Sequence, residues 1–343
     1  MNTLLRSLVG GIGLALIPVL IGVFVMLIGE TAQVRTVNFF LINLIIVLGL
    51  QVSMGNSNIA NLGHVTFMGI AAYGAAVLSI PITIKATILP DAPFGVSEVQ
   101  LGVVQAALIG IAVSTCFAFL TGLVLSRQSG IAATIITLAL IVVVHTVFIN
   151  WNELTRGARA LYGIPIKTNI VWLMAVAAIA VVIARLFRDS TLGVQLRASG
   201  EDFLAAAAMG VNVTRLRLVA WVLSGAIISV AGVMYTFLIG SISPKSFYFE
   251  TVFLTLAMLI LGGMRSVSGA VIGAVVVTIG FEFMRYLESA PEIVGFQLPQ
   301  IFGLTGFFLG TIIVLSMALR PDGIVGNDEL DEMLQNRVRD RQG

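Results

Sequence analysis

Residues that could carry chemistry are few in this 343-residue chain, and they lie far apart. The two histidines, His64 and His145, stand away from Cys116 and from any cluster of carboxylates. Since a metal site needs several such ligands together, the sequence predicts none. Ser224 before Gly225 suggests an intramembrane serine protease as one hypothesis. A Ser-Gly pair in a small-residue helix ordinarily serves helix packing, so we do not expect a protease.

Nucleotide hydrolysis by this chain is not expected either. The lysine of a P-loop follows a glycine, because the glycine-rich loop must cradle the phosphates. The three lysines, Lys85, Lys167 and Lys245, follow Ile or Pro. The sequence therefore predicts a non-catalytic chain with no cofactor of its own.

The composition is that of a membrane protein. Hydrophobic residues make up 58% of the chain, charged residues 10%, and the mean hydropathy is +1.04. A soluble domain carries about 25% charged residues. Apolar stretches long enough to cross about 30 Å of hydrocarbon recur, without the alternation typical of β-barrels. We expect an all-α polytopic membrane protein with about ten transmembrane or re-entrant helices, at residues 8–28, 37–54, 59–80, 101–125, 130–150, 169–187, 217–239, 251–263, 267–287 and 298–318.

The third and eighth expected spans are rich in small or polar residues, so we expect them to be broken or re-entrant. The stretches GIAAYGAA (69–76) and SGAVIGAVV (268–276) both predict tight helix packing. A repeat of five plus five spans is one interpretation of their likeness. Residues 1–320 would form the transmembrane domain, and the polar tail 321–343 a short, poorly ordered cytoplasmic end.

The distribution of positive charge predicts the orientation. The apolar stretch after Arg6 is longer than the core of a signal peptide. We therefore expect this stretch to be the first membrane span and not a cleavable signal. With the N-terminus in the cytoplasm, twelve of the 19 Lys and Arg residues lie on the cytoplasmic side. This excess predicts cytoplasmic N- and C-termini and a cytoplasmic loop at about 188–216. The net charge of +2 gives no reason to expect nucleic-acid binding.

Polar residues inside the expected spans are candidates for a transport pathway or for helix packing. Asn43 and Gln51 lie about two turns apart in the second span, and Asn61, His64 and Gly69 lie near the start of the third. Polar contacts between helices are at least as common as pore-facing side chains. For His64, we favour a structural role in orienting a broken helix.

A charged, alanine-rich segment separates the sixth and seventh expected spans. Ser199 and Asp202 fit a capping box, and Glu201 and Asp202 would lie at the positive end of the helix dipole. Alanines at 205–208 favour a helix, and Gly210 is suited to a left-handed C-cap. We expect a helix of about ten residues, with Thr214 capping the helix that follows.

Small residues give this short helix a flat face with an apolar anchor, formed by Phe203, Leu204 and Ala207. Such a face suits docking into a groove of another protein. The alternative is an interfacial helix that lies on lipid. The polar face lacks the Lys and Arg enrichment typical of that role.

Four stretches of the chain, in this order, resemble the permease subunits of branched-chain amino-acid ABC importers. They are NLGHVTFMGIAAYGAA (61–76), GVQLRASGEDFLAAAAMGVNVTRLRLVAWVLSG (193–225), ISPKSFYFETVFLTLAMLILGGMRSVSGAVIGA (242–274) and LRPDGIVG (319–326). The second resembles the cytoplasmic coupling loop of such permeases. The chain differs from the pattern of this family in two places. The start of the third span is rich in amides, with Asn56, Asn58 and Asn61. Alanines stand at 206 and 207, where the family often has a Glu.

The resemblance implies a multi-subunit importer. A second permease subunit, in a heterodimer, would complete the pore, two ATP-binding subunits would hold ATP and Mg, and a periplasmic or lipid-anchored binding protein would deliver substrate. The chain would lie in the lipid of a bacterial or archaeal cytoplasmic membrane. Coupling to the ATPase would involve Ser199, Glu201, Asp202, Phe203, Leu204, Ala207 and Gly210.

Glu282 and Arg285 share a helix face near the predicted outer end of the ninth span. This position favours an interfacial ion pair, or a contact with the binding protein, over a proton relay. Branched-chain or other hydrophobic amino acids are the first expectation for the substrate, and urea or short amides the alternative within related permeases. A stand-alone ion-coupled secondary transporter is the alternative from another class, but few ionisable residues occur near the expected midplane.

Overall fold

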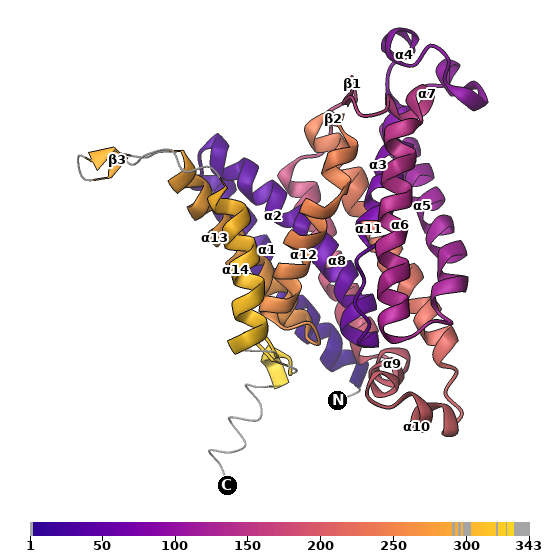
Figure 1. Cartoon of the computed structure of the whole chain (residues 1–343). Coiled ribbons are helices and arrows are strands. Elements are labelled where there is room, and N and C mark those ends of the chain that lie inside the picture. Colours follow the sequence, from indigo (N-terminus) through magenta and orange to yellow (C-terminus); the bar gives the residue numbers. More distant parts are fainter. Residues whose placement is uncertain are drawn as a thin grey trace.

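The computed structural model describes residues 3–289, 292–293, 296–297, 303–319, 322–326 and 328–332, and these residues are almost entirely helical (Figure 1). The α-helices are α1 (Thr3–Ile28), α2 (Thr31–Leu50), α3 (Val65–Ser79), α4 (Ile82–Ile88), α5 (Val103–Leu125), α6 (Gly130–Asn150), α7 (Asn152–Thr155), α8 (Ile170–Asp189), α9 (Thr191–Glu201), α10 (Phe203–Ala208), α11 (Val213–Ile239), α12 (Phe249–Gly262), α13 (Val267–Glu288) and α14 (Leu304–Leu319). Three shorter turns are the π-helix η1 (Gln51–Gly55) and the 3₁₀-helices η2 (Pro93–Glu98) and η3 (Pro244–Phe247). Two antiparallel strand pairs join β1 (Leu161–Tyr162) to β2 (Ser241–Ile242) and β3 (Glu292–Ile293) to β4 (Phe296–Gln297).

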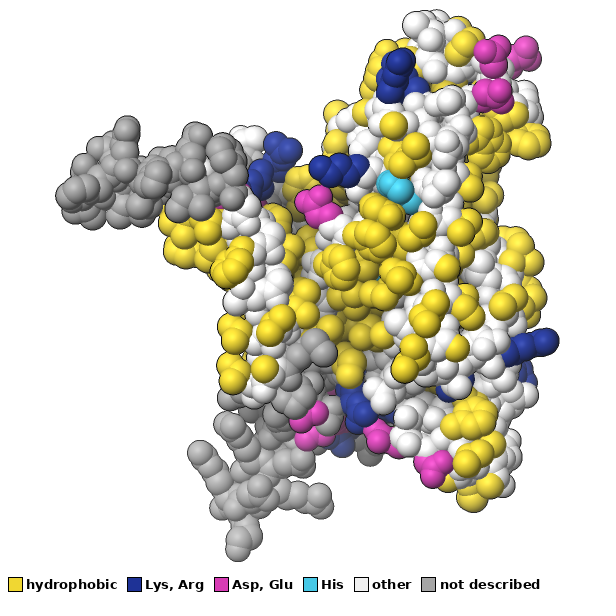
Figure 2. All heavy atoms as spheres, in the orientation of Figure 1, with side chains coloured by type: hydrophobic (Ala, Val, Ile, Leu, Met, Phe, Trp, Pro, Cys, Tyr) yellow, Lys and Arg dark blue, Asp and Glu magenta, His cyan; other side chains and the backbone are white. Residues whose placement is uncertain are grey.

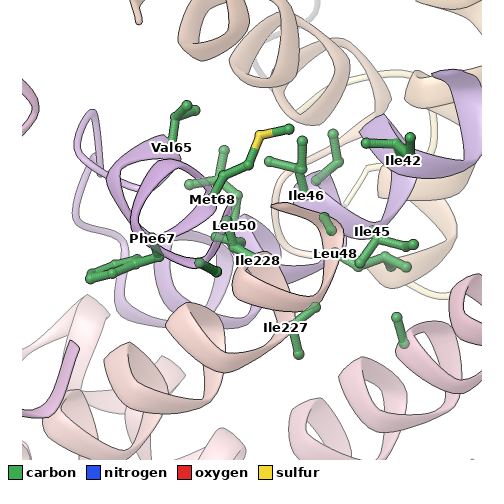
Figure 3. Packing of buried hydrophobic residues seen from close by; sticks show 14 of the residues in the cluster. Ile42, Ile45, Ile46, Leu48, Leu50, Val65, Phe67, Met68, Ile227 and Ile228 are labelled. Carbon is green, nitrogen blue, oxygen red and sulfur yellow. The ribbon is translucent and has the colours of Figure 1, made fainter. Parts of the chain in front are cut away.

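The helix α2 runs through the centre of the bundle. It packs against α8, α11 and α13. Its second half is apolar on all sides, and Ile45, Ile46 and Leu48 are completely buried. Figure 3 shows these side chains beside Met68 of α3 and Ile228 of α11. Because this half of α2 has no polar face to expose, it forms the core around which the other helices pack.

All ten apolar segments predicted from the sequence contain helix. In the described part of the chain, eight helices are long and apolar enough to cross a membrane, or nine if the bent pair α3–α4 is counted as one span. The tenth predicted segment corresponds to the shorter apolar helix α14, and its first residues, 298–302, lie outside the described residues. The expected all-α polytopic class is confirmed.

The third predicted span is broken, as expected, whereas the eighth, for which the same was expected, contains the unbroken helix α12. Residues 58–64 leave the helical conformation, α3 begins only at Val65, and α3 and α4 meet at an angle of 115°. The side-chain amide of Asn56 donates to the carbonyl oxygens of Gln51 and Val52, at 3.3 and 3.1 Å. This side chain therefore satisfies backbone groups that the interrupted helix leaves without partners.

The segment after α14 is packed where it is described. The amides of Ile324 and Val325 donate to the carbonyl oxygens of Leu261 and Gly262, at 2.8 and 3.0 Å. The hydroxyl of Ser266 donates to the carbonyl oxygen of Gly326. The expectation of a poorly ordered tail is wrong for residues 322–326 and 328–332, because backbone hydrogen bonds hold the first part to the α12–α13 turn and ion pairs hold the second. The rest of the predicted tail, 333–343, lies outside the described residues.

Candidate coupling surface and charged cavity

Two helices, α9 and α10, fill the loop between α8 and α11. The side chain of Asp202 accepts the Ala205 amide at 2.9 Å and caps α10. The prediction of one helix starting at Ser199 is therefore wrong. Ser199 is buried in the last turn of α9, and its hydroxyl donates to the carbonyl oxygen of Leu196 at 2.7 Å. Since a helix already runs through Ser199, the next capping residue, Asp202, starts α10 instead.

The end of α10 agrees better with the prediction from the sequence. Gly210 has a φ of +82° and ends this segment in the left-handed conformation, as predicted. Asn212 caps α11 by accepting the Arg215 amide at 3.0 Å. The predicted cap at Thr214 is wrong by two residues. Both Asn and Thr can cap a helix, and α11 begins one turn earlier than its apolar run suggests.

The outer side of α10 is an exposed apolar surface, which we call the α10 surface. Exposed fractions are 48% for Phe203, 77% for Leu204 and 84% for Met209, and Ala207 is also exposed. Figure 1 shows α10 at one extreme end of the bundle, and Figure 2 shows hydrophobic atoms gathered there. The guanidinium of Arg217 lies 5.6 Å from the centre of the Phe203 ring. Apolar side chains in this arrangement offer an anchor for another protein.

In contrast to α10, the helix α9 is fixed to the membrane bundle by polar contacts. The guanidinium of Arg197 donates to the side-chain oxygen of Asn56 at 2.8 Å and to the carbonyl oxygen of Arg188 at 2.7 Å. Glu201 forms an ion pair with Arg265 at 2.6 Å. Burial, together with the nearby charge of Arg188, lowers the pKa of Arg197 to about 10, so it remains charged at neutral pH. These contacts join α9 to the end of the broken α2 and to the α12–α13 turn.

A buried ion cluster holds the C-terminal segment against α8 and α13. We call this cluster the tail clamp. Glu329 is fully buried and pairs with Arg185 at 2.9 Å and with Arg188 at 3.0 Å. Its carboxylate also accepts the backbone amides of Val267 and Ser268, at 2.8 and 2.9 Å. A carboxylate is favourable there, because these amides form the positive N-terminus of α13.

Sequence reasoning missed the tail clamp. Arg185 and Arg188 stand in the last turn of an apolar helix, and an acidic stretch of sequence includes Glu329, Asp331 and Glu332. The opposite charges are a signal, but 144 residues separate Arg185 from Glu329 in the sequence. Only the folded chain shows that they meet.

At the end of the bundle opposite to α10 lies a cavity of about 380 Å³, which we call the charged-rim cavity. Figure 2 shows the surface hollowed there, with charged atoms above hydrophobic ones. The elements α2, α11, α12 and α13 contribute aromatic and apolar walls that include Phe39, Phe40, Tyr235, Leu254 and Phe281. The charged lining residues are Arg35, Lys245, Glu250, Glu282 and Arg285.

Three of the predicted site residues meet at the charged-rim cavity. Asn43, Glu282 and Arg285 all line it. The guanidinium of Arg285 donates to the carboxylate of Glu282 at 3.2 Å, and both side chains are partly exposed. A weak, exposed ion pair at a cavity mouth can exchange partners readily.

The other four candidates for the pathway lie in the packed interior. Gln51 is completely buried in η1, and Asn61 donates to the hydroxyl of Ser53 at 3.3 Å. The ring of His64 bridges the carbonyl oxygen of Asn61, at 3.0 Å, and the hydroxyl of Thr255 in α12, at 2.8 Å. A side chain at Gly69 would meet the ring of Phe148 at 2.7 Å. These positions serve helix packing in this conformation, although Asn61 also borders a small cavity of about 40 Å³.

No group of three or more potential metal ligands occurs among the described residues. His145 stacks on the ring of Tyr248, with the ring centres 3.8 Å apart. This stacking places His145 in the packing between α6 and the start of α12.

A polytopic helical bundle with an exposed apolar helix at one end and a charged cavity at the other has the features of a membrane subunit of a transporter. A family model described as the branched-chain amino acid transport system permease component matches residues 32–317. The chain belongs to this family.

Individual relatives agree with the family match. The high-affinity branched-chain amino acid transport system permease protein LivM of Salmonella typhimurium is 27% identical over 320 residues, which cover 83% of this chain and 68% of that protein. LivM of Escherichia coli K12 is 27% identical over 321 residues, with the same coverage. The probable LivH permease of Methanocaldococcus jannaschii is 31% identical over 144 residues, or 42% of this chain and 43% of that protein. No solved structure matches.

Proposed function

We propose that this chain is the pore-forming, non-catalytic permease subunit of an ATP-driven importer for branched-chain or other hydrophobic amino acids. The observation that carries this proposal is the α10 surface. An apolar helix that the fold holds out at the end of a membrane bundle suits docking into a groove of a water-soluble subunit. The family and the LivM relatives support the same class of machine.

The proposed assembly has four kinds of subunit. A second permease of the LivH type completes the pore, and two ATP-binding subunits, which hold ATP and Mg, dock on the α10 surface. A substrate-binding protein delivers the amino acid to the charged-rim cavity. In a bacterial or archaeal cytoplasmic membrane, both termini and the α10 surface face the cytoplasm, and the charged-rim cavity faces outward.

Coupling runs through α9. When the ATP-binding subunits move, they displace α10, and α9 moves with it across the short connection at Asp202. The Arg197–Asn56 hydrogen bond passes this displacement to the break after η1, and the Glu201–Arg265 ion pair passes it to the α12–α13 turn. A π-turn and a loop are places where a helix can bend without losing its packing along its length. The two routes thus act on α2 and α13, which both line the charged-rim cavity.

The charged-rim cavity has the chemistry to receive a zwitterion with an apolar side chain. Glu250 or Glu282 can accept the ammonium group, and Arg35, Lys245 or Arg285 can donate to the carboxylate. The aromatic walls below would contact the hydrophobic side chain. Urea lacks both charges and the apolar group, so this lining favours amino acids over the alternative substrate.

Reconstitution in proteoliposomes tests the proposal. We expect leucine uptake to need ATP and all the proposed subunits, and excess isoleucine, but not urea, to compete. The purified chain alone should hydrolyse no ATP. Uptake by this chain alone, driven by an ion gradient, would contradict the proposal and favour a secondary transporter.

Cysteine labelling tests the orientation. In a Cys116→Ala background, we expect Glu201→Cys to react only with reagents on the cytoplasmic side and Pro93→Cys only with external ones. The reverse pattern would place the α10 surface outside the cell and remove its coupling role.

A further inference from the structure

One segment at the end of the bundle opposite to α10 has no part in the proposed transport pathway. After α3, the chain turns by 115° into α4 and then into η2, and this segment, residues 82–98, projects beyond the spans (Figure 1). We call it the knob. The amide of Leu101 donates to the carbonyl oxygen of Leu78 at 2.9 Å and closes its base.

The knob has a small interior of its own. Ile88, Leu89 and Ala92 are buried, and Lys85 is completely buried. The ammonium group of Lys85 donates to the carbonyl oxygen of Val96 at 2.9 Å and to that of Val99. These hydrogen bonds hold the far side of the loop against α4, so the knob presents its tip in a defined position.

At the tip stands Phe94, whose side chain is 86% exposed, the greatest exposed fraction among the large hydrophobic residues of the described chain. Its φ is +61°, in the left-handed region that a residue with a side chain rarely adopts. Folding therefore places an aromatic ring in solvent in an unfavourable backbone conformation, with no buried contact for the ring in return. Strain at a position that does nothing for the fold is typical of a binding residue.

The loop that carries Phe94 is acidic in its own sequence. Asp91 and Glu98 flank it and are exposed, and Lys85, which is buried, is the only Lys or Arg between residues 80 and 101. An acidic loop is repelled by the anionic headgroups of a bilayer and attracted by a basic protein surface. Exposed aromatic residues with a charged rim are the common composition of protein interfaces.

We propose that the knob is a docking point for the substrate-binding protein, in which the Phe94 ring enters an apolar pocket rimmed by Lys or Arg residues of that protein. This inference rests on the proposed importer function and adds a contact surface to it. The acidic residues Asp91 and Glu98 steer the approach, and Phe94 provides the anchor once the two proteins meet.

The test measures binding of the purified binding protein to the reconstituted importer. We expect Phe94→Ala and Phe94→Gly to weaken binding at least about tenfold, as loss of an aromatic anchor does, and to abolish stimulation of ATP hydrolysis by the binding protein. Basal ATP hydrolysis should stay unchanged. Glycine accepts a positive φ freely, so Phe94→Gly relieves strain, and a loss of binding in this variant is not a folding defect. The control, Phe24→Ala, removes an aromatic side chain that is 63% exposed on α1 and should bind normally.

A charge-reversed variant, Asp91→Lys with Glu98→Lys, tests the second part of the inference. We expect its association to be slower at low ionic strength and to lose most of the salt dependence seen for the original chain. Phe94→Trp in vesicles with brominated lipids, with the native Trp151, Trp172 and Trp221 replaced by Phe, tests the competing location. Quenching without the binding protein would put the ring in lipid and contradict the proposal, whereas a change in fluorescence only when the binding protein is added supports it.

The experiments distinguish an error in the docking proposal from an error in the proposed importer function. If the original assembly takes up no amino acid and is not stimulated by any binding protein, the proposed function is wrong. If the original assembly is stimulated, and Phe94→Ala and Phe94→Gly bind and respond equally well, only the docking role of the knob is wrong.

Discussion

The α10 surface and the tail clamp lie at the same end of the molecule but have opposite constructions. In α10, hydrophobic side chains are exposed to solvent, whereas in the tail clamp a carboxylate and two guanidinium groups are buried. Each arrangement is unfavourable in free energy for an isolated protein unless other contacts compensate for it. In the tail clamp the compensation is internal, because the charges satisfy one another. For α10 we propose that it comes from another protein, and this difference would separate a permanent brace from a surface that exchanges partners.

The largest effect is expected in the tail clamp. Glu329→Ala removes the completely buried carboxylate that pairs with Arg185 and Arg188 and caps α13, and it leaves the two guanidinium groups to less buried carboxylates such as Asp189. Breaking a buried ion pair from one side costs about 3–5 kcal/mol. Thermal unfolding in detergent should show a large decrease in Tm. An unchanged Tm would mean that the clamp is not a brace, and the comparison with α10 would fail.

An intermediate effect is expected at the end of α10. Gly210→Val places a β-branched residue at a φ of +82°, which costs about 1–2 kcal/mol of local stability. The strain should loosen α10 and reduce ATP-driven uptake, while Tm changes little because the site is exposed. Gly210→Asn is the matched control, since Asn tolerates this conformation better. Equal uptake by the Val and Asn variants would show that the geometry of this turn is unimportant for coupling.

A small effect on stability is expected for the ion pair between α9 and the α12–α13 turn. Glu201 is 65% exposed, so Glu201→Ala should change the free energy of unfolding by less than about 1 kcal/mol. Uptake per ATP hydrolysed should nevertheless fall, because one of the two routes from α9 is lost. If the ratio of uptake to hydrolysis stays constant, the Glu201–Arg265 pair does not transmit motion.

Local signals in the sequence predicted much of the fold. The lengths of the apolar runs gave all ten helical segments, and Gly210 marked the end of α10, because both depend on neighbouring residues only. The start of α10 was predicted wrongly. Ser199 and Asp202 are both good caps, and the choice between them depended on α9, which buries Ser199 against the bundle.

Long-range contacts explain what the sequence could not predict. Asn43 of α2 and Gln51 at the start of η1 lie about two turns apart, yet only Asn43 borders the charged-rim cavity, because neighbouring helices bury Gln51 completely. The tail clamp depends on pairing between Arg185 and residues far along the chain. No periodicity or composition encodes which distant residues will meet.

The most direct test of the central claim, that α10 is the docking surface for the ATP-binding subunits, uses Ala207→Glu. This exposed alanine contributes little to the fold, so the variant should keep the Tm of the original chain. A carboxylate buried at the interface would cost several kcal/mol, and we expect the ATP-binding subunits no longer to co-purify. Full co-purification with normal uptake would contradict the claim and leave α10 as a helix that lies on lipid.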